Sequence, residues 1–305
     1  MPLKAPGVLI ISGPTASGKT ALAVRLAHTF DAEIVGADSR HIYSGMPIGT
    51  AAPTVVEQNT VPQHLIGFLD PHERYSAARF SEDATAAIQQ IHARGKRAIV
   101  VGGTGFYIRV LTGAVDLAPQ FDPVLRDRLA REVRIHDGEF LFEWLEALDP
   151  LRAAKLYRKD TYRVVRALEV VLAPEHAVRR AGAIKSLLSA GIPFFKSFLD
   201  IDQVALERRI AARTDRMLRG GLLEEAELIG NEAVAASAVG YPQANAFLRG
   251  WLTHEELRML LLRATRRYAK RQFTWFRSEP QTLWVESADA YERLTKEARE
   301  KLGWA

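Results

Sequence analysis

Short apolar runs recur along the chain, separated by longer segments in which apolar residues return every three or four positions. The first run, at residues 8–11, precedes a glycine-rich loop, and residues 19–30 then have helical spacing. Further runs at 33–37 and 97–101 flank a helical pattern at 77–94. Strands that alternate with helices in this way predict a parallel sheet with helices on both faces, and ligands bind such sheets at the carboxyl ends of the strands.

The strand pattern stops between residues 114 and 194. Charged segments of helical spacing follow one another there between Pro and Gly breaks, at 123–136, 139–147 and 161–172. A strand pattern returns at 195–201 and again at 283–285, and helical patterns occupy 203–219, 222–230, 254–276 and 288–302. We therefore predict an α/β core formed by residues 1–113 and 195–305, interrupted by a helical insertion at 114–194.

Composition excludes several kinds of site. The 305 residues include no cysteine, which rules out disulfides, thiolate metal sites and a thiol nucleophile. The N-terminal sequence, with Pro at positions 2 and 6, is too short and too interrupted for a signal peptide, and no apolar run approaches bilayer length. The net charge of +5 is modest for this size. We expect a cytoplasmic monomer that does not contact a membrane.

The loop after the first strand carries the strongest chemical signal. It follows the P-loop pattern G-x-x-x-x-G-K-[ST] and consists of Gly13, Pro14, Thr15, Ala16, Ser17, Gly18, Lys19 and Thr20. The backbone N–H groups of such a loop, and of the helix that follows, point into a single cavity that suits phosphate oxygens. Lys19 adds a positive charge, and the Thr20 hydroxyl can bind a Mg²⁺ ion that bridges phosphates. We expect a P-loop NTPase-like core whose ligand carries at least two linked phosphates.

Asp38 follows the second predicted strand. A nucleoside triphosphate hydrolase or kinase usually ends another apolar strand in Asp, which then holds the magnesium ion. Here the strand at 97–101 leads instead into Gly102, Gly103 and Thr104. Asp38 is therefore the carboxylate at a strand end close to the P-loop. Its spacing does not decide between a metal ligand and a general base.

Residues 263–277 form a basic and aromatic segment. Its cationic members are Arg263, Arg266, Arg267, Lys270, Arg271 and Arg277, its aromatic members are Tyr268, Phe273, Trp275 and Phe276, and no acidic residue occurs among them. Cations attract nucleic acid phosphates, and aromatic rings between them can stack on bases. The segment indicates a nucleic acid partner.

Ordered motifs along nearly the whole chain resemble those of the bacterial tRNA dimethylallyltransferases. Residues 37–51, ADSRHIYSGMPIGTA, are similar to the family signature A-D-S-x-Q-x-Y-x-x-M-x-I-G-T-A. The sequences GPTASGKT at 13–20 and VGGTGFY at 101–107, Asp122-Pro123 with Arg126, Val-Gly-Tyr at 239–241 and Ala-Lys-Arg-Gln at 269–272 follow in family order. A chance match of this many ordered motifs is implausible.

The resemblance implies a reaction and its ligands. Members of the family transfer a dimethylallyl group from dimethylallyl diphosphate to N6 of adenosine 37 in a tRNA anticodon loop. For this chain it implies Mg²⁺ as cofactor, tRNA and dimethylallyl diphosphate as substrates, and pyrophosphate leaving from the P-loop. It also implies that Asp38 is the catalytic base, that Thr104 lies near the reaction centre and that Arg213 reaches the diphosphate.

Two of these catalytic residues have an alternative interpretation. The Thr104 hydroxyl suits a cap for a helix that begins near Phe106. Arg213 shares helical spacing with Arg209 and Arg216, which suits a solvated basic face.

The resemblance further implies a set of tRNA contacts from the signature segment, the glycine loop, the insertion and the basic segment. The set comprises Asp38, Ser39, Arg40, His41, Thr104, Arg126, Arg163, Arg166, Gly240, Tyr241, Lys270, Arg271, Gln272, Trp275 and Arg277. His41, Tyr162 and Pro242 depart from the family pattern. Because all three lie in regions assigned to tRNA, we expect them to affect RNA affinity or preference and not the chemistry.

Two other activities compete with this interpretation. A prenyltransferase of free adenine nucleotides resembles this chain around the P-loop and Asp38, but such enzymes lack much of the insertion and the basic segment that are present here. A small-molecule P-loop kinase would instead need to transfer the γ-phosphate of ATP.

Overall fold

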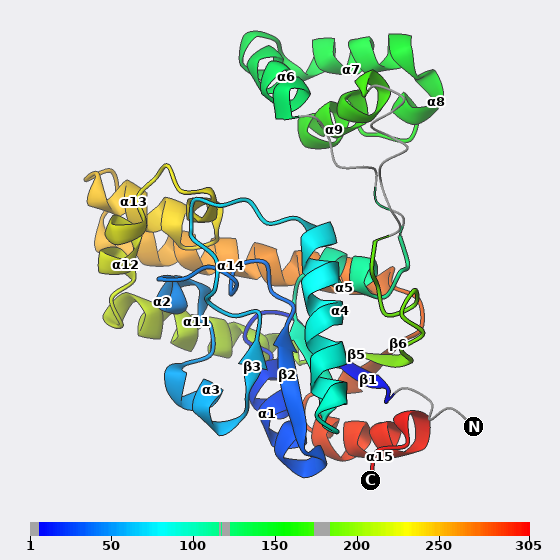
Figure 1. Cartoon of the computed structure of the whole chain (residues 1–305). Helices are drawn as coiled ribbons and strands as arrows, with labels where there is room; N and C mark the ends of the chain where they lie inside the picture. Colours follow the sequence, from blue (N-terminus) through cyan, green and yellow to red (C-terminus); the bar gives the residue numbers. More distant parts are fainter. Residues whose placement is uncertain (1–5, 116, 118–122, 174–183) are drawn as a thin grey trace. The chain divides into compact units, whose positions relative to one another are not determined.

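The computed structural model describes residues 6–115, 117, 123–173 and 184–305, and the chain divides into two compact units (Figure 1). The first unit comprises Met1–Val115 with Lys185–Ala305, and the second comprises Asp116–Ile184. The insertion predicted at 114–194 is therefore too long at its carboxyl end. Ser81 Oγ donates to Lys185 O at 2.6 Å and Leu187 N donates to Leu111 O at 2.7 Å, so the chain from residue 185 packs with the first unit.

A six-stranded parallel sheet forms the core of the first unit, in the order β3-β2-β4-β1-β5-β6. The strands are β1 (Val8–Ser12), β2 (Ala32–Gly36), β3 (Gln63–His64), β4 (Arg97–Gly102), β5 (Phe194–Asp200) and β6 (Thr282–Glu286). The α/β class with a parallel, P-loop-type sheet is thereby confirmed. The apolar pattern did not reveal β3, because two residues are too few for a periodic signal.

Helices cover both faces of the sheet. Alternate strand residues such as Leu9 and Ile11 pack on α1 (Lys19–Phe30) and α15 (Ala290–Leu302). The other face contacts α4 (Ala77–Ala93), which crosses in front of the strands in Figure 1 and packs on α5 (Gly105–Leu111). Burial on both faces explains why the strands read as continuous apolar runs.

The remaining elements of the first unit follow β2 and β5 in the sequence. They are α2 (Pro47–Thr50), α3 (Val55–Thr60), α11 (Gln203–Arg219), α12 (Leu222–Ile229), the 3₁₀ helix η1 (Val234–Ser237), α13 (Tyr241–Leu248) and α14 (His254–Arg277). The long helix α14 begins in a capping box between Thr253 and Glu256, and it packs on α11, α13 and α5. The predicted helices correspond to α11, α12 and α14, whereas the short helices α2, α3 and α13 gave no pattern.

The second unit is helical and has its own core. Its described helices are α6 (Pro123–Ile135), α7 (Gly138–Leu148), α8 (Pro150–Ala153) and α9 (Thr161–Leu172). Asp137, Asp149 and Asp160 cap the amino ends of the last three, and apolar side chains such as Leu141 and Leu168 form the core. Asp122, part of the family resemblance, lies outside the described residues.

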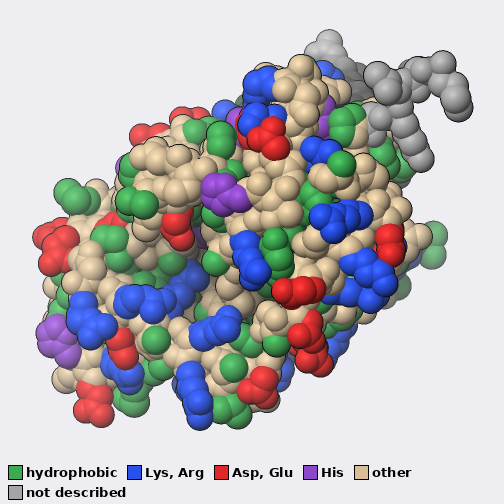
Figure 2. Space-filling model, turned by 90° about the horizontal axis from the view of Figure 1, so that it is seen from below, with side chains coloured by type: hydrophobic (Ala, Val, Ile, Leu, Met, Phe, Trp, Pro, Cys, Tyr) green, Lys and Arg blue, Asp and Glu red, His purple; other side chains and the backbone are tan. Residues whose placement is uncertain are grey.

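Charge on the surface is mixed. On the face drawn in Figure 2, Lys and Arg side chains are interspersed with Asp and Glu, so the positive net charge is not gathered into one field there. Among the helices that the structure describes, none has the length and apolar composition needed to cross a bilayer.

Trp304 tests the packing of α15 against α1. Its side chain is buried, and its ring meets the Phe30 ring edge-on at 5.2 Å. We expect Trp304→Ala to lower the free energy of unfolding by about 3 kcal/mol in a urea titration, because it leaves a large cavity. Trp251→Ala is the matched control, because Trp251 is 69% exposed and its loss should cost less than about 1 kcal/mol. Equal losses in the two variants would contradict this account of the packing.

Candidate active site

The P-loop connects β1 to α1 and presents donors that have no partner in the described part of the chain. Gly18 precedes α1 in a left-handed conformation, with φ of 92°, and has no side chain to cap the helix. The first N–H groups of any helix lack intrahelical acceptors, and those of α1 also lack a side-chain cap. The hydroxyl of Ser17 is also buried and finds no hydrogen-bond partner among the described residues. Unpaired donors at a positive helix end suit an oxyanion such as phosphate.

Lys19 brings a positive charge to this loop. Its Nζ donates to the carbonyl of Pro14 at 3.3 Å. Burial lowers the pKa of Lys19 to about 8, even though the Asp38 carboxylate acts to raise it; Arg213 adds a smaller lowering effect. The ammonium is thus poorly compensated by the protein, and an anion bound beside it would restore its pKa.

Two arginines of α11 reach the same region. Arg209 and Arg213 are four residues apart and lie on one helix face. Arg209 Nη1 donates to Ser17 O and Arg213 Nη2 donates to Thr50 O, both at 2.8 Å. Burial lowers the pKa of Arg213. The interpretation of Arg213 as part of a solvated helix face is therefore wrong. Arg209 was not among our predicted site residues, although its spacing of four residues from Arg213 could have identified it.

Asp38 lies just beyond the end of β2. Its side chain is 13% exposed, its Oδ1 accepts from Arg40 N at 2.9 Å, and its Oδ2 lies 3.9 Å from His41 Nε2. Burial works to raise the pKa of Asp38. The neighbouring His41 ring, the charges of Lys19 and Arg213, and the Arg40 N–H outweigh burial, so this pKa lies below its ordinary value. The carboxylate is therefore ionised at neutral pH.

Thr104 lies beside Asp38 on the loop after β4. Its Oγ1 accepts from Ser39 N at 3.0 Å and donates to Ser39 Oγ at 3.3 Å. In the described part of the chain this hydroxyl makes no capping bond to α5, so the alternative role as a helix cap is wrong. A Cβ atom on Gly102 would lie 2.0 Å from Ala37 O, so only glycine lets the two strand ends approach this closely.

One backbone carbonyl joins two of the polar side chains. Thr50 O accepts from Arg213 Nη2 at 2.8 Å and from His41 Nε2 at 3.1 Å. Burial lowers the pKa of His41, which keeps its ring neutral at neutral pH. His41 was predicted to contact tRNA. In the structure its ring also lies between Asp38 and the backbone of α2, where it helps to position both.

A buried glutamate of α12 holds that backbone in place. Glu225 accepts hydrogen bonds from Ile48 N at 2.8 Å, from Gly49 N at 2.6 Å and from Tyr241 Oη at 2.7 Å. Tyr241 is fully buried, and Gly240, with φ of 115°, begins α13 before it. Both were predicted to contact tRNA, but the structure places the Tyr241 ring in the protein core. The sequence motifs gave no sign of Glu225.

The cationic side chains of the basic segment lie on the exposed face of α14. Lys270, Arg271 and Trp275 line a groove of about 560 Å³ together with Arg267, Thr274 and Ser278, which we term the α14 groove. Arg277 is also exposed. Trp275 is partly covered, since the Arg109 guanidinium stacks on its ring at 4.3 Å.

Gln272 takes a different position on the same helix. It was predicted to contact tRNA, but it is only 4% exposed and faces the protein interior. Its amide bonds to the backbone of the P-loop and of the Gly102–Gly103 turn.

The predicted tRNA contacts of the second unit surround one buried carboxylate. Arg126 and Arg166 both pair with Glu169, which is 4% exposed, and the Arg126 bond measures 3.1 Å. Arg163 pairs with Asp160 at 3.4 Å and keeps 66% of its side chain exposed. Arg163 is therefore the most accessible of the three arginines.

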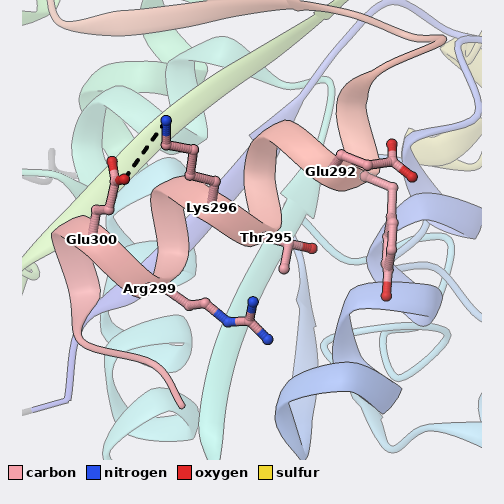
Figure 3. A pocket seen from close by; sticks show the side chains of 6 residues that line it. Glu292, Thr295, Lys296, Arg299 and Glu300 are labelled. Carbon is pink, nitrogen blue, oxygen red and sulfur yellow. Dashed lines mark ion pairs between the residues drawn. The ribbon is translucent and has the colours of Figure 1, made fainter.

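A second pocket, of about 380 Å³, lies along α15 (Figure 3). It is lined by Tyr291, Glu292, Thr295, Lys296, Arg299 and Glu300, and Lys296 pairs with Glu300 at 3.8 Å. No residue predicted for catalysis or ligand binding lines it. Its charges are mixed and partly paired, so the groups around the P-loop remain the candidate active site.

The lowered pKa of Lys19 gives the site a measurable pH dependence. Above about pH 8 the free protein loses the ammonium charge, so its affinity for pyrophosphate should fall by up to about tenfold per pH unit. Below that pH the charge is present and affinity should level off. Calorimetric titrations between pH 7 and 9.5 measure this trend. Lys19→Arg is the control, because arginine stays charged throughout and leaves only the titration of the ligand. An identical pH profile in both proteins would show that the Lys19 ammonium does not contribute to pyrophosphate binding.

Comparison with known proteins identifies the family of the chain. The family model described as IPP transferase matches residues 41–279. A tRNA dimethylallyltransferase of Citrifermentans bemidjiense is 43% identical over 285 residues, covering 92% of each chain. One of Geobacter sulfurreducens is 38% identical over 301 residues, covering 97% of each. A crystal structure of the full-length tRNA isopentenylpyrophosphate transferase of Bacillus halodurans superposes with a TM-score of 0.71 at 33% identity, covering 98% of this chain and 97% of that one. The chain belongs to the IPP transferase family.

Proposed function

We propose that this protein transfers the dimethylallyl group of dimethylallyl diphosphate to N6 of adenosine 37 in a tRNA anticodon loop and releases pyrophosphate. One observation carries the proposal: the ionised Asp38 carboxylate lies among Lys19 and Arg213 at the mouth of a phosphate-binding loop. A transfer of this kind needs a proton acceptor beside a site for a diphosphate leaving group. Family membership supports the same reaction.

The P-loop side stabilises the leaving group. As the bond between C1 of the allyl group and the diphosphate oxygen breaks, its electron pair stays on the diphosphate. Lys19, the unpaired Ser17 hydroxyl and the amino end of α1 then meet the increasing negative charge. Arg213 adds a second cation from α11. Donors held in place before the reaction cost no rearrangement when the charge appears.

The Asp38 side accepts the proton. The N6 lone pair is delocalised into the purine, so the amine becomes a better nucleophile if it loses a proton as the bond to C1 forms. Oδ1 of Asp38 is occupied by Arg40 N, which leaves Oδ2 to accept that proton. Thr104, bonded to Ser39 beside Asp38, is positioned to contact the reacting groups.

The residues around the P-loop fit Mg²⁺ as a cofactor, which we also propose. Magnesium keeps several waters and commonly takes only one or two protein oxygens in addition to substrate phosphates. Among the described residues no cluster of three acidic or histidine side chains offers a complete set of metal ligands. Thr20, in the first turn of α1, would supply one oxygen. A bound ion would neutralise diphosphate charge.

The RNA substrate carries its negative charge along the backbone. The α14 groove, with Arg267, Lys270 and Arg271, and the exposed Arg163 of the second unit offer cations that suit phosphates. We propose that these surfaces bind the tRNA. Because tRNA is found in the cytoplasm, we also propose that the protein acts there. The target adenine must leave its stack to reach Asp38.

The activity can be tested with labelled dimethylallyl diphosphate, Mg²⁺ and an unmodified tRNA that carries adenosine 37. We expect label in the tRNA without any nucleoside triphosphate, and none when guanosine replaces adenosine 37. Label that enters AMP or ADP while the tRNA stays unlabelled would overturn the tRNA assignment.

Asp38→Asn tests the proton acceptor. The asparagine retains an oxygen for the Arg40 N–H, so diphosphate binding should persist or tighten as a negative charge disappears. We expect kcat to fall by about 10²-fold or more, because the positioned base is lost. Asp31→Asn is the matched control, since Asp31 is 74% exposed and pairs with Lys96. Near-normal turnover of Asp38→Asn would exclude Asp38 as the base.

A further inference from the structure

We propose that Gln272 is a positioning residue that fixes the P-loop relative to the Gly102–Gly103 turn through the oxygen and the nitrogen of its side-chain amide. Its Oε1 accepts from Thr15 N at 2.8 Å and its Nε2 donates to Gly103 O at 3.0 Å. These partners are 257 and 169 residues away in the sequence. A single side chain thus joins two loops that reach the site from different strands.

The chemistry of the two partners requires an amide. The Thr15 N–H needs an acceptor and the Gly103 carbonyl needs a donor, and a glutamine side chain offers one of each. An ionised glutamate would turn a negative oxygen toward Gly103 O, and methionine would leave both buried groups without a strong partner. Gly103 is also constrained, because a Cβ atom there would lie 2.0 Å from Gln272 Nε2.

Both loops carry groups of the proposed reaction. Thr15 lies in the loop that we assign to the diphosphate. Gly103 precedes Thr104, whose hydroxyl bonds to Ser39, the neighbour of Asp38. The Gln272 amide therefore sets the distance between the leaving-group site and the proposed base. Misplacing reacting groups by about 1 Å can cost about 10²-fold in rate.

The position of Gln272 on α14 separates it from the RNA-binding surface. Residues two apart on a helix differ in direction by about 200°, so Gln272 and Lys270 face opposite ways. Gln272 is buried together with Ala269 and Phe276, which share its helix face. Lys270 is exposed and lines the α14 groove. Replacing Gln272 should therefore affect the diphosphate side of the reaction and spare the tRNA side.

The inference rests on the proposed function and is tested by steady-state kinetics on the full chain. We expect Gln272→Met to lower kcat/KM for dimethylallyl diphosphate by about 10- to 100-fold while the KM for tRNA stays unchanged. Lys270→Ala should show the reverse pattern, with a raised KM for tRNA and an unchanged KM for the diphosphate. Gln89→Met, the same substitution on the exposed face of α4, controls for the change of side chain.

Gln272→Glu supplies a second variant with its own signature. A protonated carboxyl group can accept from Thr15 N and donate to Gly103 O, whereas the ionised form cannot. Its activity relative to the wild-type protein should therefore recover as the pH falls from 8 to 6. The lowered pKa of Asp38 keeps the base ionised over this range. Loss of stability alone would not produce recovery of kcat in this direction together with an unchanged KM for tRNA.

The outcomes separate this inference from the proposed function. A raised KM for tRNA in Gln272→Met with normal diphosphate parameters would make Gln272 an RNA contact and overturn the inference, as would unchanged kinetics in both variants. If the wild-type protein transfers no label, the proposed function fails, and calorimetric titration with pyrophosphate then decides the inference. Weaker pyrophosphate binding by Gln272→Met supports it, and equal binding overturns it.

Discussion

The active site depends on a carboxylate kept ionised among cations at the carboxyl edge of a parallel sheet. Removing charges from water is costly, and the penalty is recovered only where opposite charges and hydrogen bonds compensate it. Asp38 compensates the buried cations Lys19 and Arg213 only in part, as the lowered pKa of Lys19 indicates. Two cations and one anion leave a positive excess. A diphosphate would complete the balance, so the same electrostatics that strain the free protein favour the proposed ligand.

Backbone contacts set the positions of these charges. The ends of β2 and β4 approach so closely that Gly102 has no room for a side chain, and this brings Asp38 beside Thr104. On the other side, the Glu225 carboxylate holds α2, so that Thr50 O is presented to Arg213. Gly102 thus helps to position Asp38, and Glu225 helps to position the acceptor of Arg213. Neither Gly102 nor Glu225 needs to touch the substrate.

The sequence predicted those parts of the site that are local in the chain. The P-loop pattern placed Lys19 after a strand and before a helix, and Asp38 followed from the next strand end, because parallel strands share one carboxyl edge. Two residues predicted as tRNA contacts, Gln272 and Tyr241, are instead buried and bond to distant parts of the chain. Gln272 and Tyr241 belong to motifs linked with tRNA, but a motif does not reveal which face of a helix is buried. Their partners lie on other elements. The sequence therefore predicted the reaction but not the residues that position its groups.

The departures from the family pattern now have physical explanations. His41 stands where Gln or Leu is common, and its Nε2 donates to Thr50 O, a bond that a glutamine amide could also make. Pro242 lies in the first turn of α13, where a missing N–H leaves no helix bond unmade. Neither change disturbs a group of the proposed reaction. Tyr162 differs, because it is 81% exposed at the start of α9, next to the accessible Arg163. Pro242 is exposed as well, so Tyr162 and Pro242 both alter the surface available to an RNA, and we expect a difference in tRNA preference between this chain and its relatives to originate at these two positions.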